Sequence, residues 1–304
     1  MDQITVTIID TISSLHTVID QIIDLPTDPP SLYLDLEGIR LGREGSISLI
    51  SILATPQNAV YIVDIHQLQQ SAFSTTSTKG ESLRGMLESM NIPKVFFDIR
   101  NDSDALFSHY QIRVNGVIDL QLLELASRTY SRDFISGLAK CIQNDSIAFS
   151  TVKTNWLNIK ERGSQLFDPK KGGCYEVFNE RPLKAELVQY CAYDLAMSSH
   201  LWEIYSIKLR KTDMAFWRYM VRKATIDRIK LSQSVGYNGQ APSKVCGPWD
   251  QYIIDEETES WNDDVLMFAR DGDDLDKDDN WVSASAAGVA QESSILTLMA
   301  QIKY

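Results

Sequence analysis

Asp35 and Glu37, two carboxylates spaced two residues apart, lie at the end of the apolar sequence SLYLDLEG. Such a sequence is typical of a strand, and side chains at positions i and i+2 of a strand point to the same face. Two carboxylates held this close repel each other unless a cation lies between them. Their hard oxygens suit Mg²⁺ or Mn²⁺ better than zinc, so the pair is a candidate metal site. Taken alone, such a pair is more often a solvated strand end.

A third candidate carboxylate is Asp102, in the sequence KVFFDIRNDSDALFSHY, where a short strand runs into a helix. An acid at the start of a helix is also a favourable cap, so capping is the structural alternative. Asp98 and Asp104 compete with Asp102 for the functional role. The segment therefore supplies a third carboxylate whose identity the spacing alone leaves open.

Tyr190 and Asp194 interrupt an otherwise apolar helical sequence, LVQYCAYDLAMSSHLW. They are four residues apart, so they share one face of the helix. The structural alternative is a half-exposed tyrosine beside an exposed aspartate. The sequence thus offers a phenol and a fourth carboxylate, and it shows no P-loop, dinucleotide-binding glycine motif or Ser/His/Asp arrangement.

The elements that must position these residues fall into two groups along the chain. Apolar, β-branched runs predict strands, and the short spacers between three of the early runs predict antiparallel hairpins. Later strands alternate with helical periodicity, which predicts a mixed sheet with helices on its faces. The predicted strands are 4–9, 31–36, 46–53, 59–65, 94–97 and 117–120, and the predicted helices are 12–23, 79–90, 102–110, 183–208 and 213–234. Residues 149–182 look less regular.

The order of these motifs resembles the DEDDy signature of the DnaQ-like 3′–5′ exonucleases, a group that includes ribonuclease D and the Werner exonuclease domain. That signature is D-x-E on a strand, an Asp after a KV-type strand, and Y-x-x-x-D on a late helix. VIDLQLLELA at 117–126 and the later RPL sequence also resemble ribonuclease D. The resemblance covers residues 3–206, and the wording RNDSDAL is most similar to fungal and Egalitarian-like members. It implies an α/β, ribonuclease-H-like fold with a mixed five-stranded sheet flanked by helices and a C-terminal helical and acidic extension.

Carried over position by position, the resemblance implies a metal-dependent 3′–5′ exonuclease that hydrolyses phosphodiester bonds of RNA or single-stranded DNA. Two divalent ions, Mg²⁺ or Mn²⁺, would clamp the scissile phosphate in such a site. Asp35, Glu37, Asp102 and Asp194 would be the metal ligands, and Tyr190 would orient the attacking water.

Three details refine the resemblance. Asp102 is preferred over Asp104 because the residues that follow it then match the apolar register of the family. The histidine branch of the superfamily would need a histidine at Gln189, so that subclass is excluded. In ribonuclease D the Trp-containing segment leads almost directly into the RPL sequence, whereas here residues 158–180 separate Trp156 from Arg181. We expect this inserted loop to lie near the last motif, where it could bear on the substrate path.

Nucleic-acid binding requires cations, and two segments offer them. Residues 208–230 carry eight Lys or Arg residues against two acids, with aromatic residues interleaved. The loop 170–173 (KKGG) is the second, since glycine lets the backbone approach a phosphate closely. The alternatives are a solvated helix packed on the domain and a flexible surface loop. The candidate contacts are Lys170, Lys171, Arg181, Arg218 and Arg222.

The formal net charge of −12 is concentrated in one segment of the chain. Residues 250–279 contain thirteen acids and two bases, whereas residues 1–249 are close to neutral. We therefore expect an exonuclease domain at 1–212, a basic helix and a Gly/Pro-containing loop at 213–249, and an acidic, disordered tail with a marginal helix at 250–304. The tail could fold back on the basic helix and compete with nucleic acid, or it could simply aid solubility.

The cysteines and the hydropathy of the sequence indicate the kind of cellular compartment. The four cysteines lack C-x-x-C spacing, so neither a zinc site nor a redox pair is suggested, and a reducing intracellular compartment is expected. Neither a signal peptide nor a membrane-spanning apolar run is evident, and nucleus and cytoplasm are not separated. The rival interpretations are a weakly active or inactive binding or scaffold protein of the same fold, and a protein-interaction adaptor built on residues 213–304. Retention of all five site residues favours the active enzyme.

Overall fold

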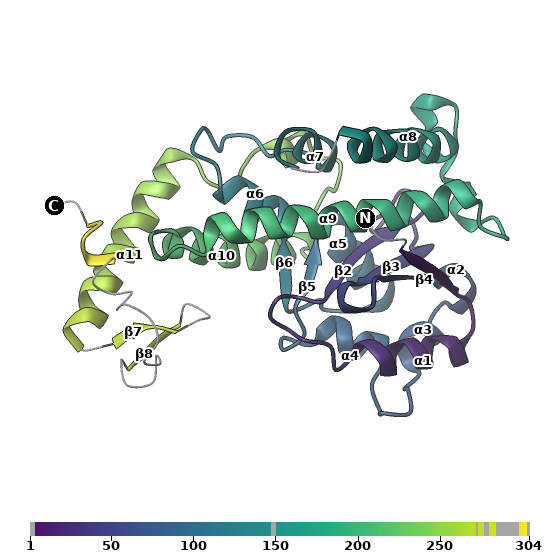
Figure 1. Cartoon of the computed structure of the whole chain (residues 1–304), viewed down its shortest axis with the longest axis horizontal. Coiled ribbons are helices and arrows are strands. Elements are labelled where there is room, and N and C mark those ends of the chain that lie inside the picture. Colours follow the sequence, from purple (N-terminus) through teal and green to yellow (C-terminus); the bar gives the residue numbers. More distant parts are fainter. Residues whose placement is uncertain (1–3, 147–149, 272, 277–279, 284–297, 303–304) are drawn as a thin grey trace.

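The sheet at the centre of the molecule has six strands in the order β1-β4-β3-β2-β5-β6 (Figure 1). The computed structural model describes residues 4–146, 150–271, 273–276, 280–283 and 298–302. The predicted mixed α/β sheet is confirmed. The count of five strands implied by the family resemblance is wrong, because the strand predicted at 4–9 forms β1, an edge strand parallel to β4. The strands are β1 Thr5–Ile9, β2 Leu32–Glu37, β3 Leu49–Ala54, β4 Ala59–Asp64, β5 Lys94–Phe96 and β6 Val117–Asp119.

β2, the strand that carries Asp35 and Glu37, lies in the interior of this sheet. It pairs antiparallel with β3 on one side and parallel with β5 on the other. β3 also pairs antiparallel with β4, so the predicted antiparallel arrangement of these three strands is confirmed. β5 in turn pairs parallel with β6. The D-x-E sequence is therefore held by hydrogen-bonded neighbours on both sides.

Helices cover both faces of the sheet, and α9 is the longest of those in the described ranges (Figure 1). The predicted helices at 12–23, 79–90, 102–110 and 183–208 are confirmed with small shifts of their ends. The helices before the C-terminal extension are α1 Ile12–Ile22, α2 Ile65–Leu68, α3 Ser71–Ser74, α4 Leu83–Glu88, α5 Arg100–Tyr110, α6 Leu120–Ala126, α7 Leu138–Asp145, α8 Ser150–Phe167 and α9 Ala185–Leu209.

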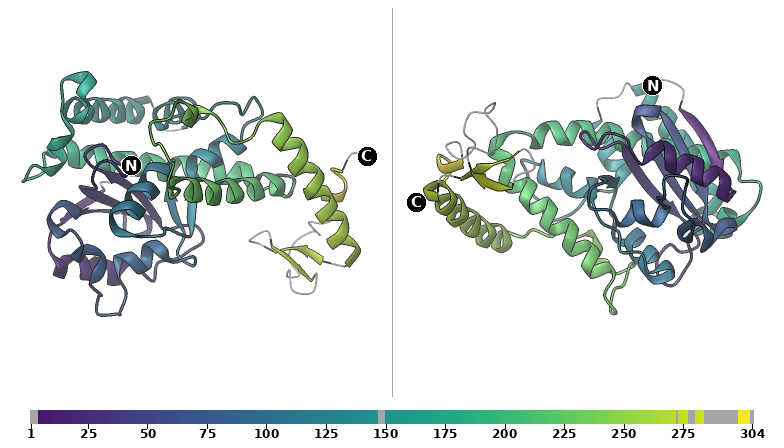
Figure 2. Two further views of the ribbon diagram at one scale, coloured as in Figure 1. Left: turned by 180° about the vertical axis from the view of Figure 1, so that it is seen from behind. Right: turned by 90° about the horizontal axis from the view of Figure 1, so that it is seen from below.

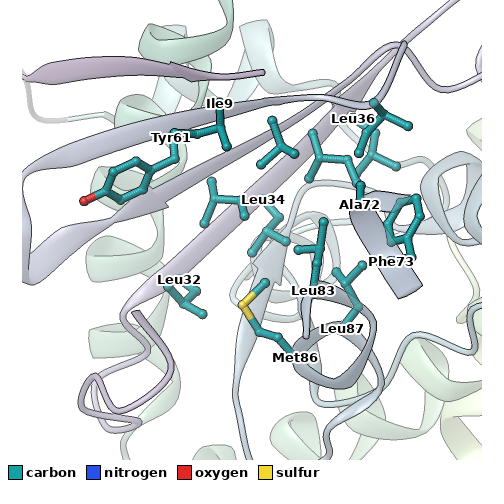
Figure 3. Packing of buried hydrophobic residues seen from close by; sticks show 14 of the residues in the cluster. Ile9, Leu32, Leu34, Leu36, Tyr61, Ala72, Phe73, Leu83, Met86 and Leu87 are labelled. Atoms are coloured by element: carbon teal, nitrogen blue, oxygen red, sulfur yellow. The ribbon is translucent and has the colours of Figure 1, made fainter. Parts of the chain in front are cut away.

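The side chains of β2 alternate between two separate hydrophobic cores. Leu34 and Leu36 are buried in the core formed with α1, α3, α4 and α5 (Figure 3). Tyr33 belongs to the core on the opposite face, which α9 covers. Asp35 and Glu37 share the alternation phase of Tyr33. Their carboxylates therefore face α9 instead of the aliphatic core.

The inserted segment 158–180 is not a single loop, because residues 158–167 form the second half of α8 and two short 3-10 helices follow at Pro169–Lys171 and Tyr175–Asn179. The apolar positions of α8 include Trp156 and Ile159, and these side chains are buried. Gly163 stands in the helix interior, where glycine costs about 1 kcal/mol of helix propensity relative to alanine. That glycine and the serine, threonine and asparagine residues of α8 have low helix propensity, so they weaken the helical pattern in the sequence. The irregular structure predicted for 149–182 is therefore wrong over 150–167. Packing against α9 stabilises the helix instead.

The C-terminal extension begins with α10 Ala215–Ser232, which packs against α5 and α6 and confirms the helix predicted for 213–234. α11 Gln251–Asp271 then leads away from the sheet toward a small hairpin (Figure 2). That hairpin consists of β7 Asp273–Leu275 and β8 Trp281–Ser283. Within the described residues, we find no helix with both the length and the apolar character needed to cross a membrane.

The disorder expected for the acidic tail was wrong over residues 251–271, which form α11. Trp261 and Val265, four residues apart, are buried on one face of this helix. The Trp261 ring lies 5.5 Å from that of Tyr219 on α10, and Lys223 forms an ion pair with Glu257. Acidic residues surround these apolar positions in the sequence, so the composition of the segment does not reveal the apolar face of the helix. The marginal helix predicted at the end of the chain falls largely outside the described residues, and the domain boundaries stay a prediction.

Candidate active site

Four of the five predicted site residues line one cavity between β2 and α9. Asp35 and Glu37 approach it from the strand, and Tyr190 and Asp194 approach it from the helix. The cavity has a volume of about 190 Å³, and Lys160 of α8 lies in the same lining. Two segments that are more than 150 residues apart in the sequence thus bring their polar groups to one place.

The helix α9 holds its two polar residues against the sheet through the apolar residues around them. Leu187 and Cys191 are fully buried between α9 and the strands. Tyr190 and Asp194 are only 9% and 5% exposed, so neither is the solvated side chain that the structural alternative required. The Tyr190 hydroxyl lies near the Glu37 carboxylate and favours its ionised form, which lowers the pKa of Glu37 and so opposes the effect of burial.

Asp102 lies on the first turn of α5, directly after β5, and is only 6% exposed. It stands outside the lining of the cavity. Burial raises its pKa well above the usual value, and the nearby charges of Asp35 and Glu37 raise it further. Asp102 therefore shares the electrostatic environment of the two strand carboxylates.

The two carboxylates that compete with Asp102 are engaged by arginines. Arg100 Nε donates to Asp98 Oδ1 over 2.6 Å. Arg43 Nε donates to Asp104 Oδ1 over 2.7 Å, and the Arg43 backbone amide donates to the other oxygen of the same carboxylate. Both acids thus have structural partners, which supports the choice of Asp102.

Burial and mutual repulsion dominate the electrostatics of the cavity. Burial, together with the charge of Asp194, raises the pKa of Asp35 to about 7, although the charge of Lys160 opposes this rise. Burial and the Asp35 charge likewise raise the pKa of Glu37 well above its usual value. The pKa of Tyr190 is also raised by burial, so its hydroxyl stays protonated and able to donate. Buried carboxylates with raised pKa values are expected at sites where a bound cation neutralises their charge.

The helix α8 supplies contacts to this site that the motifs did not predict. Trp156 Nε1 donates to Asp194 Oδ1 over 2.8 Å, and Lys160 Nζ donates to Asp194 Oδ2 over 2.6 Å. The inserted segment therefore lies beside the last motif, as expected from the sequence. The W-x-x-x-K spacing could have predicted that Trp156 and Lys160 share one face of a helix. That prediction required α8 to be recognised as a helix from the sequence.

The donor chemistry of the site fits a divalent ion. Asp35, Glu37, Asp102 and Asp194 offer carboxylate oxygens, which Mg²⁺ and Mn²⁺ prefer. Within the described ranges, however, no three His, Cys, Asp or Glu side chains lie close enough together to form a ready-made metal site. The carboxylate of Asp194 is turned toward α8. These residues could hold a metal after rotation of their side chains.

Two of the arginines predicted to contact nucleic acid have partners inside the protein. Arg181 forms an ion pair with the fully buried Asp64 and donates to the carbonyl oxygen of Phe178 over 2.9 Å. Arg218 donates to the carbonyl oxygens of Leu209 and Lys211, which lie at the end of α9. Both guanidinium groups thereby stabilise the positions of nearby backbone carbonyl groups. A role in nucleic-acid binding stays a prediction for both arginines.

The remaining predicted contacts are exposed. Lys171 forms an ion pair with Glu161 of α8, which ties the short turn 169–171 back to that helix. Lys170 lies in the same turn. Arg222 is on the exposed side of α10. These three side chains remain candidates for contact with a nucleic-acid backbone.

Two curated proteins share sequence similarity with this chain. The piRNA biogenesis protein EXD1 of Bombyx mori is 23% identical over 216 residues, which cover 68% of this chain and 60% of that protein. The human protein of the same name is 27% identical over 166 residues, covering 54% of this chain and 30% of that protein. The chain thus spans between about a third and three fifths of the length of these relatives.

Solved structures of ribonuclease D share the fold. The RNase D of Trypanosoma brucei in complex with RNA U12 superposes with a TM-score of 0.62 at 18% identity, covering 84% of this chain and 79% of that one. RNase D of Escherichia coli superposes with a TM-score of 0.50 at 14% identity, covering 76% of this chain and 51% of that one. The family model described as a 3′–5′ exonuclease matches residues 6–209, the part of the chain that contains the whole candidate site. The chain therefore belongs to the 3′–5′ exonuclease family of the DnaQ-like, DEDDy type.

Proposed function

We propose that this chain is an active, metal-dependent 3′–5′ exonuclease whose catalytic residues are Asp35, Glu37, Asp102, Tyr190 and Asp194. The observation that carries this proposal is the meeting of the strand carboxylates with the Tyr190–Asp194 pair around one cavity. Membership of the exonuclease family supports it. The raised pKa values of the strand carboxylates support it further, because such a cluster is neutralised best by a cation.

In this proposal the four carboxylates are the metal ligands and Tyr190 positions the water. Bound Mg²⁺ or Mn²⁺ would make the attacking water nucleophilic and stabilise the leaving 3′ oxygen. The Tyr190 hydroxyl stays protonated and already lies within hydrogen-bonding reach of Glu37. It is therefore suited to orient a water molecule next to that carboxylate, and unsuited to remove a proton at neutral pH.

We propose RNA as the substrate, with single-stranded DNA as the alternative that the test below distinguishes. The silkworm and human relatives are named for piRNA biogenesis, and the trypanosomal RNase D structure contains RNA U12. We also propose an intracellular, reducing compartment, because all four cysteines are free thiols.

The test is degradation of 5′-labelled RNA and DNA oligomers of one sequence, with Mn²⁺, Mg²⁺ or EDTA. A ladder that shortens from the 3′ end only when metal is present, faster on RNA, is the expected result. Asp35→Asn should abolish the ladder, whereas Asp10→Asn, an exposed aspartate at the end of β1, should leave it unchanged. A ladder of wild-type strength with Asp35→Asn would contradict catalysis by this site.

The alternative function is nucleic-acid binding by a weak or inactive exonuclease fold. One observation favours it, because the described acids do not converge on a ready-made metal site. Under this alternative the protein binds labelled RNA, and neither metal produces a ladder. Under the proposed function, cleavage appears as soon as metal is added.

A further inference from the structure

The carboxylate of Asp194 is already occupied, because α8 engages both of its oxygens. Trp156 donates to one oxygen over 2.8 Å, and the Lys160 ammonium contacts the other over 2.6 Å. A carboxylate oxygen that accepts a charge-assisted hydrogen bond at this distance cannot at the same time offer that lone pair to a metal ion. Lys160 therefore competes with a metal ion for this oxygen of Asp194.

The Lys160 ammonium is a cation that lies among the carboxylates of the candidate site. Lys160 lines the same cavity as Asp35 and Glu37, and its charge lowers the pKa of both. Its Nζ also lies 4.9 Å from the ring centroid of Tyr190 and 5.2 Å from that of Trp156. A single ammonium thus partly neutralises several carboxylates in the protein without metal.

The fold holds α8 close enough for this contact. Gly163, three residues after Lys160, faces Tyr190, and a Cβ at this glycine would lie 2.8 Å from the Tyr190 Cβ. Trp156, four residues before Lys160, is fully buried. These three positions share the face of α8 that packs on α9. The Lys160 side chain is nevertheless 28% exposed, so the ammonium has a route out of the cavity.

We propose that the Lys160 ammonium occupies the place of a divalent ion at Asp194, and that metal binding must displace it. This inference rests on the proposed function, since it assumes that Asp194 is a metal ligand. A divalent ion carries twice the charge of the ammonium and prevails at sufficient concentration, but it binds more weakly than it would to the free carboxylates. Lys160 thereby sets the concentration of metal at which the site fills.

Calorimetric titration of Mn²⁺ into the full-length protein tests the proposal directly. Lys160→Met keeps the length of the side chain and removes its charge, so it should bind Mn²⁺ at least about tenfold more tightly than wild type. Lys160→Arg keeps the charge and should bind no more tightly than wild type. Arg162→Met removes one charge from an exposed position of the same helix and is the matched control, expected to leave the affinity unchanged.

The outcomes separate this proposal from the proposed function. If Lys160→Met binds Mn²⁺ no more tightly than wild type, the role of Lys160 is overturned. If Asp35→Asn abolishes Mn²⁺ binding in the same experiment, the proposed metal site still stands. Loss of detectable binding in every variant overturns both proposals. Tighter binding in Lys160→Met than in Arg162→Met supports displacement over a general effect of net charge.

A second measurement uses the wild-type protein alone and does not depend on the folding of a variant. Acetylation by an amine-reactive reagent, read by mass spectrometry, should be faster at Lys160 with Mn²⁺ than with EDTA. Lys170, exposed and outside the cavity lining, is the internal standard. Equal or slower labelling of Lys160 in the presence of Mn²⁺ would contradict its displacement.

Discussion

Trp156 and Asp194, on two different helices, are joined by a hydrogen bond of 2.8 Å from the indole Nε1 to the carboxylate Oδ1. The indole is fully buried and the carboxylate nearly so. Because an unpaired buried charge is costly, this contact stabilises the ionised carboxylate as well as its orientation. The helix α8 thus anchors the last candidate catalytic residue.

Trp156→Phe removes the donor and keeps an aromatic ring. We expect the free energy of unfolding to fall by about 2–3 kcal/mol, because a hydrogen bond to a charged group is lost in a buried place. Unfolding in urea measures this change. Trp249→Phe, a buried tryptophan of another core, controls for the smaller ring and should leave the exonuclease rate unchanged. A Trp156→Phe protein that loses no more stability than Trp249→Phe would contradict the role given to this contact.

Tyr190→Phe removes one hydroxyl and keeps the packing of the ring. In the proposed mechanism the hydroxyl orients a water beside Glu37 and does not bind metal, so we expect kcat to fall by about 10- to 100-fold with little change in KM. Asp194→Asn should cost several orders of magnitude more, because it removes a metal ligand. Single-turnover degradation of labelled RNA compares the two variants. Equal losses would place Tyr190 in the metal site itself.

Gly163→Ala adds a single methyl group at the contact between α8 and α9. Alanine in a helix is usually more stable than glycine by about 1 kcal/mol. Here its Cβ would lie 2.8 Å from the Cβ of Tyr190, so we expect a net loss of about 1–3 kcal/mol and a slower exonuclease. Thermal unfolding and the labelled-RNA assay measure both effects. Gly137→Ala, where the added Cβ meets no atom within 4 Å, should change neither.

Lys94 gives the stability of the protein a pH dependence that is independent of the candidate site. Its ammonium is fully buried on β5 and donates to the carbonyl oxygens of Met86 and Ser89 over 2.8 Å. Burial lowers its pKa to about 7, whereas a lysine in an unfolded chain titrates near 10.4. Between these values the unfolded chain binds more protons, so the free energy of unfolding rises with pH.

The expected rise between pH 7 and pH 9 is about 1–2 kcal/mol relative to Lys94→Met, which lacks this titration. Urea unfolding at several pH values measures the two curves. If the curves of wild type and Lys94→Met run parallel over this window, the buried ammonium does not titrate as described.

The sequence predicted most of the sheet and the placement of the strand carboxylates, because alternation along a strand is a strong local pattern. Asp35 and Glu37 face α9 for the same reason that Leu34 and Leu36 face the opposite core. Family resemblance, and not local pattern, selected Asp102 over its neighbours. The structure supplies a physical account of that choice, since arginines bind the competing acids.

What the sequence did not predict depends on contacts between distant segments. α8 contains a glycine and several serine, threonine and asparagine residues of low helix propensity. Its packing on α9 stabilises the helix, which brings Trp156 and Lys160 to Asp194. α11 is too acidic to be recognised by composition, and it is fixed by the burial of Trp261 against α10. In both cases tertiary packing outweighs the local preference.

The most direct test of the account follows the fate of a label at the 3′ end of a single-stranded RNA. With Mn²⁺ present, wild-type protein should release the label first as a mononucleotide, and Asp35→Asn should release none under the same conditions. Release of the label as a longer fragment would contradict exonucleolytic polarity. Equal release by wild type and Asp35→Asn, or no release by wild type with either metal, would contradict catalysis at the cavity between β2 and α9.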